Sequence, residues 1–396
     1  MALARSPEAL RAELHALDER SLRRRRATVT AGEAPHPTQL LIDGQRVVNF
    51  CSNDYLGLAA EPALIAAMCA AAQRCGAGSG ASHLVTGHGT EHAALELELA
   101  EFTQRQRALL FSTGYMANLG VISSLIGRDD LLLGDWLNHA SLIDAGALAR
   151  AERQRYPHAD ADSARQMLAA ARGAAPERGV LLATDGVFSM DGDLAPLPAL
   201  AVAAREHGAW MLVDDAHGIG VLGATGRGTL EHFGLGAADV PLLIGTLGKA
   251  LGSFGAFVAG DEDLIELILQ RARAYIYTTA LPQPVAAASR AALRCVQSQP
   301  WRREKLHALV ARFRERANAR GVELGASTSP IQPIIVGDEQ RALAISGALR
   351  AAGFWVTAIR PPTVPRGSAR LRVTLSAAHA DSEVDALVDA LARALE

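Results

Sequence analysis

The chain has 396 residues, of which 49% are hydrophobic and 20% are charged. A chain of this length and composition can bury a large core and form more than one domain. Its net charge of −3 and its pI of about 6.5 argue against a nucleic-acid partner, because no general positive field is present. Every apolar run of about 18 residues contains charge or clustered glycine, so we expect no membrane-spanning helix.

Targeting signals and metal motifs are also not expected. The N-terminal segment mixes acidic residues such as Glu8 and Glu13 with arginines and has no apolar h-region. The four cysteines are scattered without metal-ligand spacing, which is typical of reduced core residues rather than of disulfides. We therefore expect a cytoplasmic protein without a metal site.

The first 45 residues predict a helix followed by a short hairpin, LLIDGQRVVNF, with Asp43-Gly44 as its turn. A basic run, Arg23 to Arg26, follows the helix. Such a run fits a solvated face or an interface arm, and a carboxylate-binding arm is the alternative.

Helical and apolar stretches alternate from about residue 60 to residue 290. The helical stretches include EHAALELELAEFTQ and LPALAVAAREHG, and the apolar runs are RALLFSTG, DLLLGDW, VLLATDG, AWMLVDDAHG, PLLIGTLGK and GAFVAG. This alternation predicts a mainly parallel sheet with helices on both faces. Ligands of such sheets bind beyond the carboxyl ends of the strands.

The remainder of the chain predicts a smaller domain. One long helix is expected to begin near Pro284 and to continue through Arg302 and Lys305. The stretches PIQPIIVGD, FWVTAIR, ARLRVTLSAAH and DSEVDALVDALARAL then predict a small sheet with helices on one face. We predict an N-terminal arm over 1–50, a large domain over 51–290 and a small domain over 291–396.

Lys249 is the most informative candidate for a catalytic residue. It lies in a glycine-rich turn after one apolar run, while Asp214 and His217 end another run upstream. A lysine for a Schiff base, a carboxylate for the pyridine nitrogen and a nearby imidazole are what a pyridoxal phosphate enzyme needs. The alternatives are a surface lysine, a helix-capping aspartate and an ordinary loop histidine. The residues alone do not choose between Asp214 and its neighbour Asp215, which alternate along the strand.

Other candidates lie at a further strand end and in loops. FSTGYMANLG closes a strand at Gly114 and opens a helix at Tyr115, where backbone N–H groups suit a phosphate. Hydroxyls of Thr246 and Thr279 could add donors. His139, in WLNHASLIDAG, could stack on a pyridine ring and transfer protons, or it is a surface loop residue.

Two further positions suit ligand contacts. Ser189 lies in a turn, for which simple turn chemistry of Asp191-Gly192 is the alternative. Arg372 shares a strand face with Arg370 and could clamp a carboxylate, or both could be solvated.

Taken together, these segments resemble the α-oxoamine synthase family of fold-type-I pyridoxal phosphate enzymes, over nearly the whole chain. The strings that carry the resemblance are NFCSNDYLGL, GAGSGASHLVTGHGTEHAALE, FSTGYMAN, LNHASLIDA, DGVFSMDGDLAPL, VDDAHGIGVLGATGRG and TLGKALGSFGA. The implied fold is α/β, with a mainly parallel seven-stranded sheet between helices in the large domain and a smaller α+β C-terminal domain. Sites of this fold are usually built at a dimer interface, so a homodimer is expected.

The resemblance also assigns roles. Lys249 matches the Schiff-base lysine, Asp214 the partner of the pyridine nitrogen and His139 the stacking histidine; all three are catalytic candidates. Further matches to cofactor-contacting positions are Gly114, Tyr115, Ser189, His217, Thr246 and, across a dimer interface, Thr279. Substrate-side matches are Arg23, Asn53 and Arg372, with Arg372 as carboxylate clamp.

The implied reaction is a decarboxylative condensation of an amino acid with an acyl thioester. The strings IQPIIVGD and VTAIRPPTVPRGSARLRVTLSAAH are similar to those of the biotin-pathway branch, which implies L-alanine with pimeloyl-CoA or a pimeloyl carrier protein. The chain departs from the family pattern at Tyr115, where another aromatic is common, and at GASHLVTGHG, where a glycine-richer loop is usual.

Three alternatives remain open. A sister synthase would use glycine or serine with another acyl-CoA. A non-catalytic subunit would keep the fold as a scaffold, although such chains typically lose the lysine that is present here as Lys249. An aminotransferase on the same fold would make a keto acid without releasing carbon dioxide.

Overall fold

The computed structural model describes residues 6–30 and 38–396, and the chain divides into two compact units. One unit comprises residues 53–307, and the other combines residues 1–52 with residues 308–396. The structure thus groups the two ends of the chain, which the sequence analysis treats as separate segments. The domain boundaries at residues 50 and 290 stay predictions.

The large unit contains a seven-stranded sheet with the order β4-β10-β9-β8-β7-β5-β6. Only β10 runs against its neighbours, so the predicted mainly parallel sheet is confirmed. In chain order the strands are β4 (Arg107–Phe111), β5 (Leu131–Asp135), β6 (Glu152–Tyr156), β7 (Val180–Asp185), β8 (Trp210–Asp214), β9 (Leu242–Thr246) and β10 (Ala256–Gly260).

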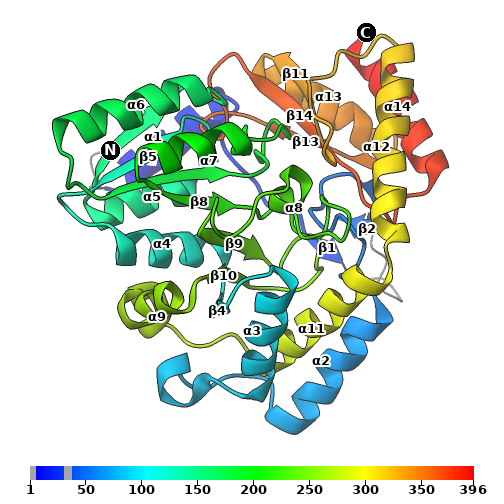
Figure 1. The fold of residues 1–396 in the computed structure, drawn as a ribbon. Helices are drawn as coiled ribbons and strands as arrows, with labels where there is room; N and C mark the ends of the chain where they lie inside the picture. The colour runs from blue at the N-terminus through cyan, green and yellow to red at the C-terminus, as the bar shows by residue number, and fades with distance from the viewer. Residues whose placement is uncertain (1–5, 31–37) are drawn as a thin grey trace. The chain divides into compact units, whose positions relative to one another are not determined.

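Helices cover both faces of this sheet (Figure 1). One core cluster joins the sheet to α4 (Gly114–Leu125), α5 (Ala140–Ala149) and α9 (Glu262–Arg271). Helices α6 (Ala161–Ala174) and α7 (Leu197–Glu206) pack together and contact β6 and β8. Burial on both faces explains why the central strands are apolar throughout. The sequence analysis missed only β6, a charged strand at the sheet edge whose residues are mostly exposed.

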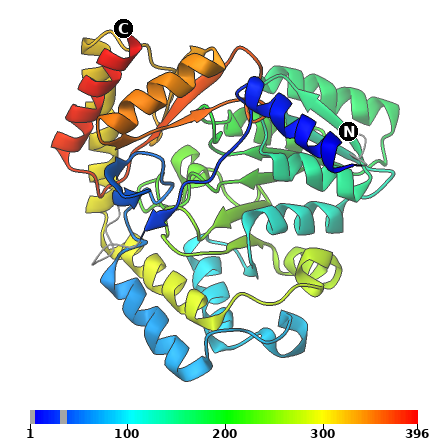
Figure 2. The ribbon, with the colours of Figure 1, turned by 180° about the vertical axis from the view of Figure 1, so that it is seen from behind.

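The other helices of this unit lie around the sheet. Helices α2 (Pro62–Cys75) and α11 (Gln283–Ser298) run side by side (Figure 2). The remaining elements are the π-helical turn η1 (His83–Gly87), α3 (Thr90–Phe102), α8 (Thr229–Phe233) and α10 (Arg273–Ile276).

One prediction about the helices is wrong. The single long helix expected from Pro284 through Lys305 is two helices, α11 and α12 (Trp301–Ala319). Pro300 separates them: proline has no N–H to donate and disfavours helical backbone in the residue before it. That residue, Gln299, leaves the helix with φ −123° and ψ 62°.

The second unit contains two small sheets. The first has the order β1-β2-β3-β12 and includes the predicted hairpin of β2 (Gln39–Ile42) and β3 (Gln45–Asn49), with both turn residues at positive φ. The second sheet has the order β11-β14-β13 and packs against α13 (Glu339–Ala351). The other elements are α1 (Pro7–Glu19), β1 (Val29–Thr30), β11 (Ile331–Gly337), β12 (Phe354–Trp355), β13 (Thr357–Ile359), β14 (Ala369–Thr374) and α14 (Asp381–Leu395).

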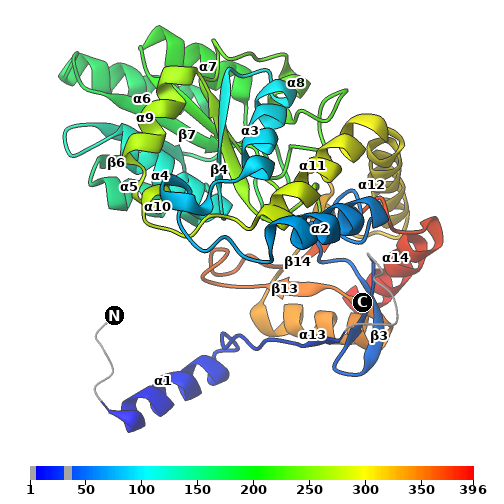
Figure 3. The same ribbon diagram turned by 90° about the horizontal axis from the view of Figure 1, so that it is seen from below.

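Helices α12 and α14 lie alongside each other (Figure 3), joined by ion pairs such as that of Arg312 with Asp385. The division between the two units falls within α12. Among the described residues, no helix combines the length and apolarity needed to cross a membrane.

Candidate active site

Lys249 and His217 meet beyond the carboxyl ends of two neighbouring strands. His217 follows β8 and Lys249 follows β9, which is paired with β8 in parallel. The amine nitrogen Nζ of Lys249 lies 2.9 Å from Nε2 of His217. The topology of the sheet therefore brings together the amine and the imidazole that the sequence analysis singled out.

A fully buried tyrosine, Tyr55, holds the other side of the His217 ring. Its hydroxyl lies 2.7 Å from Nδ1 of His217 and donates a hydrogen bond of 3.2 Å to Oδ1 of Asn53. Because the single phenolic proton goes to Asn53, the Tyr55 oxygen accepts from the Nδ1–H of His217, which leaves Nε2 as the acceptor that faces Lys249. A chain of polar contacts thus runs from Asn53 through Tyr55 and His217 to Lys249.

The two adjacent aspartates occupy different environments, as strand alternation requires. Oδ2 of Asp214 accepts a hydrogen bond of 2.7 Å from Nδ2 of Asn118. Oδ2 of Asp215 accepts one of 2.7 Å from the backbone N–H of Thr229. Burial raises the pKa of Asp215 to about 8, so this carboxyl is largely protonated at neutral pH.

His139 lies within the electrostatic reach of Asp214 and Lys249. Burial lowers the pKa of His139, while the charge of Asp214 raises it and the charge of Lys249 lowers it. Such charge effects act over short distances, so the three side chains lie near one another. The ring Nδ1 of His139 lies 2.7 Å from Oγ of Ser141, which orients the imidazole at the start of α5.

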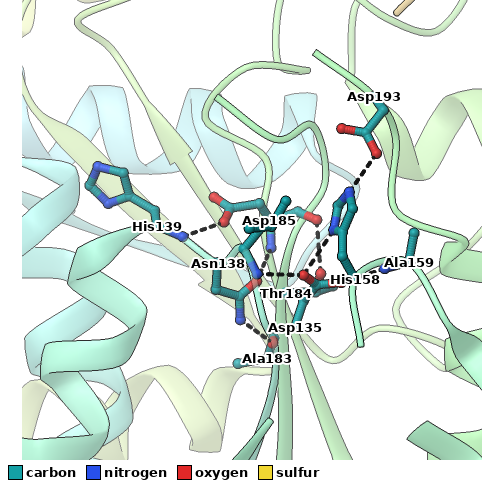
Figure 4. Close-up of polar contacts among 10 residues, drawn as sticks. Asp135, Asn138, His139, His158, Ala159, Ala183, Thr184, Asp185 and Asp193 are labelled. Carbon is teal, nitrogen blue, oxygen red and sulfur yellow. Dashed lines mark hydrogen bonds and ion pairs between the residues drawn. The ribbon is translucent and has the colours of Figure 1, made fainter. Parts of the chain in front are cut away.

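Polar contacts behind His139 fix its backbone (Figure 4). The N–H of His139 donates to Oδ2 of Asp185 over 2.7 Å. Asn138 accepts the backbone N–H of Asp185 and donates to the carbonyl of Ala183, which ties this loop to β7. Burial and the charge of Asp214 raise the pKa of Asp185 well above its ordinary value.

A charged histidine braces the neighbouring loops. His158 lies between Asp135 and Asp193, at 2.9 Å and 2.8 Å from their carboxylate oxygens (Figure 4). Although burial lowers the pKa of His158, the hydrogen bonds and charges of the two carboxylates raise it to about 10. This ion-paired cluster holds the end of β5 to the loop that carries Ser189.

The start of α4 offers backbone N–H groups in open space. Thr113 caps the helix by accepting a hydrogen bond of 3.1 Å from the N–H of Met116. A Cβ atom built on Gly114 would meet nothing within 4 Å. Tyr115 is partly exposed, and its hydroxyl donates to Asp144. An anionic group such as a phosphate suits this helix terminus.

The other cofactor candidates lie in loops of the same unit. Thr246 ends β9, where its hydroxyl donates to the carbonyl of Gly255 over 3.0 Å. Ser189 is half-buried in the loop after β7, and Thr279 is exposed before α11. Their contacts with a cofactor stay predictions.

Two of the three substrate candidates lie in the second unit. Arg372 and Arg370 are both buried on β14, so neither is the solvated arginine that the sequence left open. Arg23 pairs with Asp18, with Nη1 2.6 Å from Oδ2. Asn53 belongs to the large unit and contacts Tyr55. The substrate roles of Arg23, Asn53 and Arg372 stay predictions.

Sequence reasoning missed Tyr55 and Asn118. Tyr55 lies 162 residues before its partner His217, and Asn118 lies 96 residues before Asp214. Tyr55 falls within the string NFCSNDYLGL, and Asn118 lies one helical turn after Gly114. A polar residue in an otherwise apolar helix start was the available signal for Asn118.

These donors fit pyridoxal phosphate. The site combines a lysine amine, a buried carboxylate and imidazoles, which are groups that suit the aldehyde carbon, the pyridine nitrogen and the ring oxygen of this cofactor. The free amides of α4 suit the phosphate.

Comparison with known proteins agrees with this chemistry. A family model described as aminotransferase class I and II matches residues 45–391. Solved structures with a similar fold include serine palmitoyltransferase from Sphingomonas wittichii, with a TM-score of 0.92 and 33% identity over 100% of this chain and 98% of that chain. A serine palmitoyltransferase from S. paucimobilis, with bound PLP, has a TM-score of 0.91 and 30% identity over the same shares of the two chains.

Curated relatives are closer in sequence. The 8-amino-7-oxononanoate synthase of Methylococcus capsulatus is 60% identical over 92% of this chain and 93% of its own length. That of Thioalkalivibrio sulfidiphilus is 57% identical over 98% of this chain and 97% of its own length. The chain therefore belongs to the 8-amino-7-oxononanoate synthases, the pyridoxal-phosphate-dependent acyltransferases of biotin biosynthesis.

Proposed function

We propose that this enzyme condenses L-alanine with the pimeloyl thioester of CoA or of a carrier protein. The products are 8-amino-7-oxononanoate, carbon dioxide and the free thiol carrier. The observation that carries the proposal is the contact of Lys249 Nζ with His217 Nε2 at 2.9 Å. Lys249 and Asp214 also lie close enough to His139 to shift its pKa. Sister synthases of the family use glycine or serine, and the curated relatives favour the alanine reaction for this chain.

The cofactor supplies an electron sink that stabilises negative charge at the α-carbon of the amino acid. Lys249 would anchor the cofactor through its amine and would take the α-proton of alanine. Asp214 keeps the proton on the pyridine nitrogen, and Asn118 fixes the direction of this carboxylate through the 2.7 Å hydrogen bond. His139 contacts the ring and assists proton transfer, with its backbone fixed by Asp185.

The remaining residues position the ligands. His217 contacts the phenolic oxygen and is oriented by Tyr55. Gly114, Tyr115, Ser189 and Thr246 line the cofactor site, and Thr279 completes the phosphate contacts from a second copy of the chain. Arg372 clamps the alanine carboxylate, and Arg23 and Asn53 contact substrate.

This proposal includes a homodimer that works in the cytoplasm. Sedimentation of the cofactor-loaded protein tests the dimer, which should be present at enzyme assay concentrations. A monomer with full activity would contradict the assignment of Thr279.

Substrate choice is tested with a matrix of amino acids and acyl thioesters. L-Alanine, glycine and L-serine are each paired with pimeloyl-CoA, acetyl-CoA and palmitoyl-CoA, and thiol release and product mass are measured. We expect rapid thiol release only for L-alanine with pimeloyl-CoA, and none with Lys249→Ala. Activity confined to glycine with acetyl-CoA would indicate a sister synthase, and keto acid formation without thiol release would indicate an aminotransferase.

A further inference from the structure

Three histidines that the proposed reaction does not use form a cluster in the large unit. His83 lies in η1, His88 follows it, and His92 lies in the first turn of α3. One ring nitrogen of each lies within 4.8 Å of those of the other two. The two Nδ1 atoms of His83 and His88 are 3.0 Å apart. In a tetrahedral zinc site with metal–nitrogen bonds of about 2.0–2.1 Å, ligand nitrogens lie roughly 3.3–3.4 Å apart.

The buried member of the cluster has one ring nitrogen without a hydrogen-bond partner in the described part of the chain. His83 is only 6% exposed and stacks on Tyr275, with ring centroids 4.9 Å apart. Its Nε2 is buried and makes no hydrogen bond within the described part of the chain. Its Nδ1 faces another imidazole nitrogen, and only one of that pair can carry the shared proton. Buried polar atoms without partners are rare, and a bound ion is one way in which such atoms are satisfied.

His92 is held in the tautomer that a metal ligand needs. The backbone N–H of Gly89 donates to its Nδ1 over 3.0 Å, and its Nε2 donates to the carbonyl of Leu281. Nδ1 therefore carries a lone pair and no proton. Metal-binding histidines usually donate their second N–H to a backbone carbonyl or a carboxylate in this way. Metal binding at Nδ1 would replace the contact with Gly89.

A carboxylate lies beside the cluster. Glu96 lies one turn along α3 from His92, with Oε2 3.9 Å from Nε2 of His88. This carboxylate lies on the side of the second ring nitrogen of His88, where carboxylates commonly accept the N–H of a metal-binding histidine.

We propose that His83, His88 and His92 bind one divalent transition-metal ion that prefers imidazole ligands, with Zn²⁺ as the expected occupant. Three neutral imidazoles with an oxygen ligand are a common zinc environment. Water supplies that oxygen. The ion links η1 to α3 and stiffens the contact of His92 with Leu281, two residues after Thr279. Its role is structural, and it does not depend on the proposed reaction.

Zinc content of the cofactor-loaded enzyme tests this site. Untagged protein is dialysed against a zinc buffer at fixed free Zn²⁺, and bound metal is measured by mass spectrometry together with X-ray absorption at the zinc edge. We expect one zinc per chain, bound by nitrogen and oxygen at about 2.0–2.1 Å rather than by sulfur at about 2.3 Å. Wild-type protein without stoichiometric zinc, or zinc bound by sulfur, would overturn the proposal.

Matched variants locate the ion. His88→Gln should lower zinc affinity by at least about tenfold, because it removes a ligand, and its partly exposed side chain makes a folded variant expected. His83→Gln should have the same effect, and His15→Gln, on exposed α1, should bind zinc like wild type. Unchanged zinc affinity in both His88→Gln and His83→Gln would place the ion elsewhere and refute the site. Zinc content is read without turnover, so this result is independent of the substrate assignment.

Discussion

The contact between Tyr55 and His217 gives a test of how the fold positions Lys249. Tyr55→Phe removes the hydroxyl that lies 2.7 Å from Nδ1 of His217 and leaves the ring otherwise in place. Loss of a buried hydrogen bond that leaves its partner unsatisfied costs about 1–3 kcal/mol. Because about 1.4 kcal/mol corresponds to a tenfold change in rate, kcat/KM should fall by about 5- to 150-fold if this cost is paid in the transition state.

The assay is thiol release from pimeloyl-CoA with saturating L-alanine, together with the absorbance of the bound cofactor as a function of pH. We expect Tyr55→Phe to lower kcat/KM and to shift the pH at which the cofactor absorbance titrates. The matched control is Tyr156→Phe, which removes another buried tyrosine hydroxyl, at the end of β6. Equal kinetics and equal titration in Tyr55→Phe and wild type would refute the positioning role.

Three other predictions follow from the same structure. Asp214→Asn should lower kcat by roughly 100-fold or more. Asp215→Asn should change kcat only a few-fold, because Asp215 is already largely uncharged at neutral pH. Similar losses of kcat in the two variants would contradict this distinction. Gly228→Ala should lower the free energy of unfolding in urea by about 2–4 kcal/mol, since φ is +91° and the new Cβ would lie 1.9 Å from Oδ2 of Asp215. Gly173→Ala, in open space on α6, should instead stabilise by about 0.5–1 kcal/mol. His158→Asn should cost about 2–3 kcal/mol of stability at pH 6. The folded-state pKa of His158, about 10, lies above its ordinary value of 6.5. The stability difference between wild type and His158→Asn should therefore be complete below pH 6.5 and vanish as pH rises through 10. A stability difference that grows with pH would contradict this prediction.

Sequence patterns predicted the large sheet well because its strands are buried on both faces and read as apolar runs. They failed at β6, whose sequence ERQRY is charged because it forms the exposed sheet edge. They also failed at Pro300, where apolar spacing continues across a helix break. The pairing of the chain ends into one unit is a long-range property that local patterns do not encode.

The candidate site shows the same limit. Strand ends located Lys249, His217 and Asp214, since topology places carboxyl ends of parallel strands together. Alternation alone could not choose between Asp214 and Asp215, and the structure separates their surroundings through Asn118 and Thr229. Tyr55 was missed because its contact with His217 depends on tertiary folding.

The central claim is that Lys249 holds the cofactor, and the chain offers a clean test because its only two lysines are Lys249 and Lys305. The cofactor-loaded enzyme is treated with borohydride, which makes the bond between cofactor and lysine permanent, and the digested peptides are weighed. We predict the added mass on the peptide that contains Lys249, unchanged in Lys305→Ala and lost in Lys249→Ala. Added mass on Lys305, or its persistence in Lys249→Ala, would contradict the account.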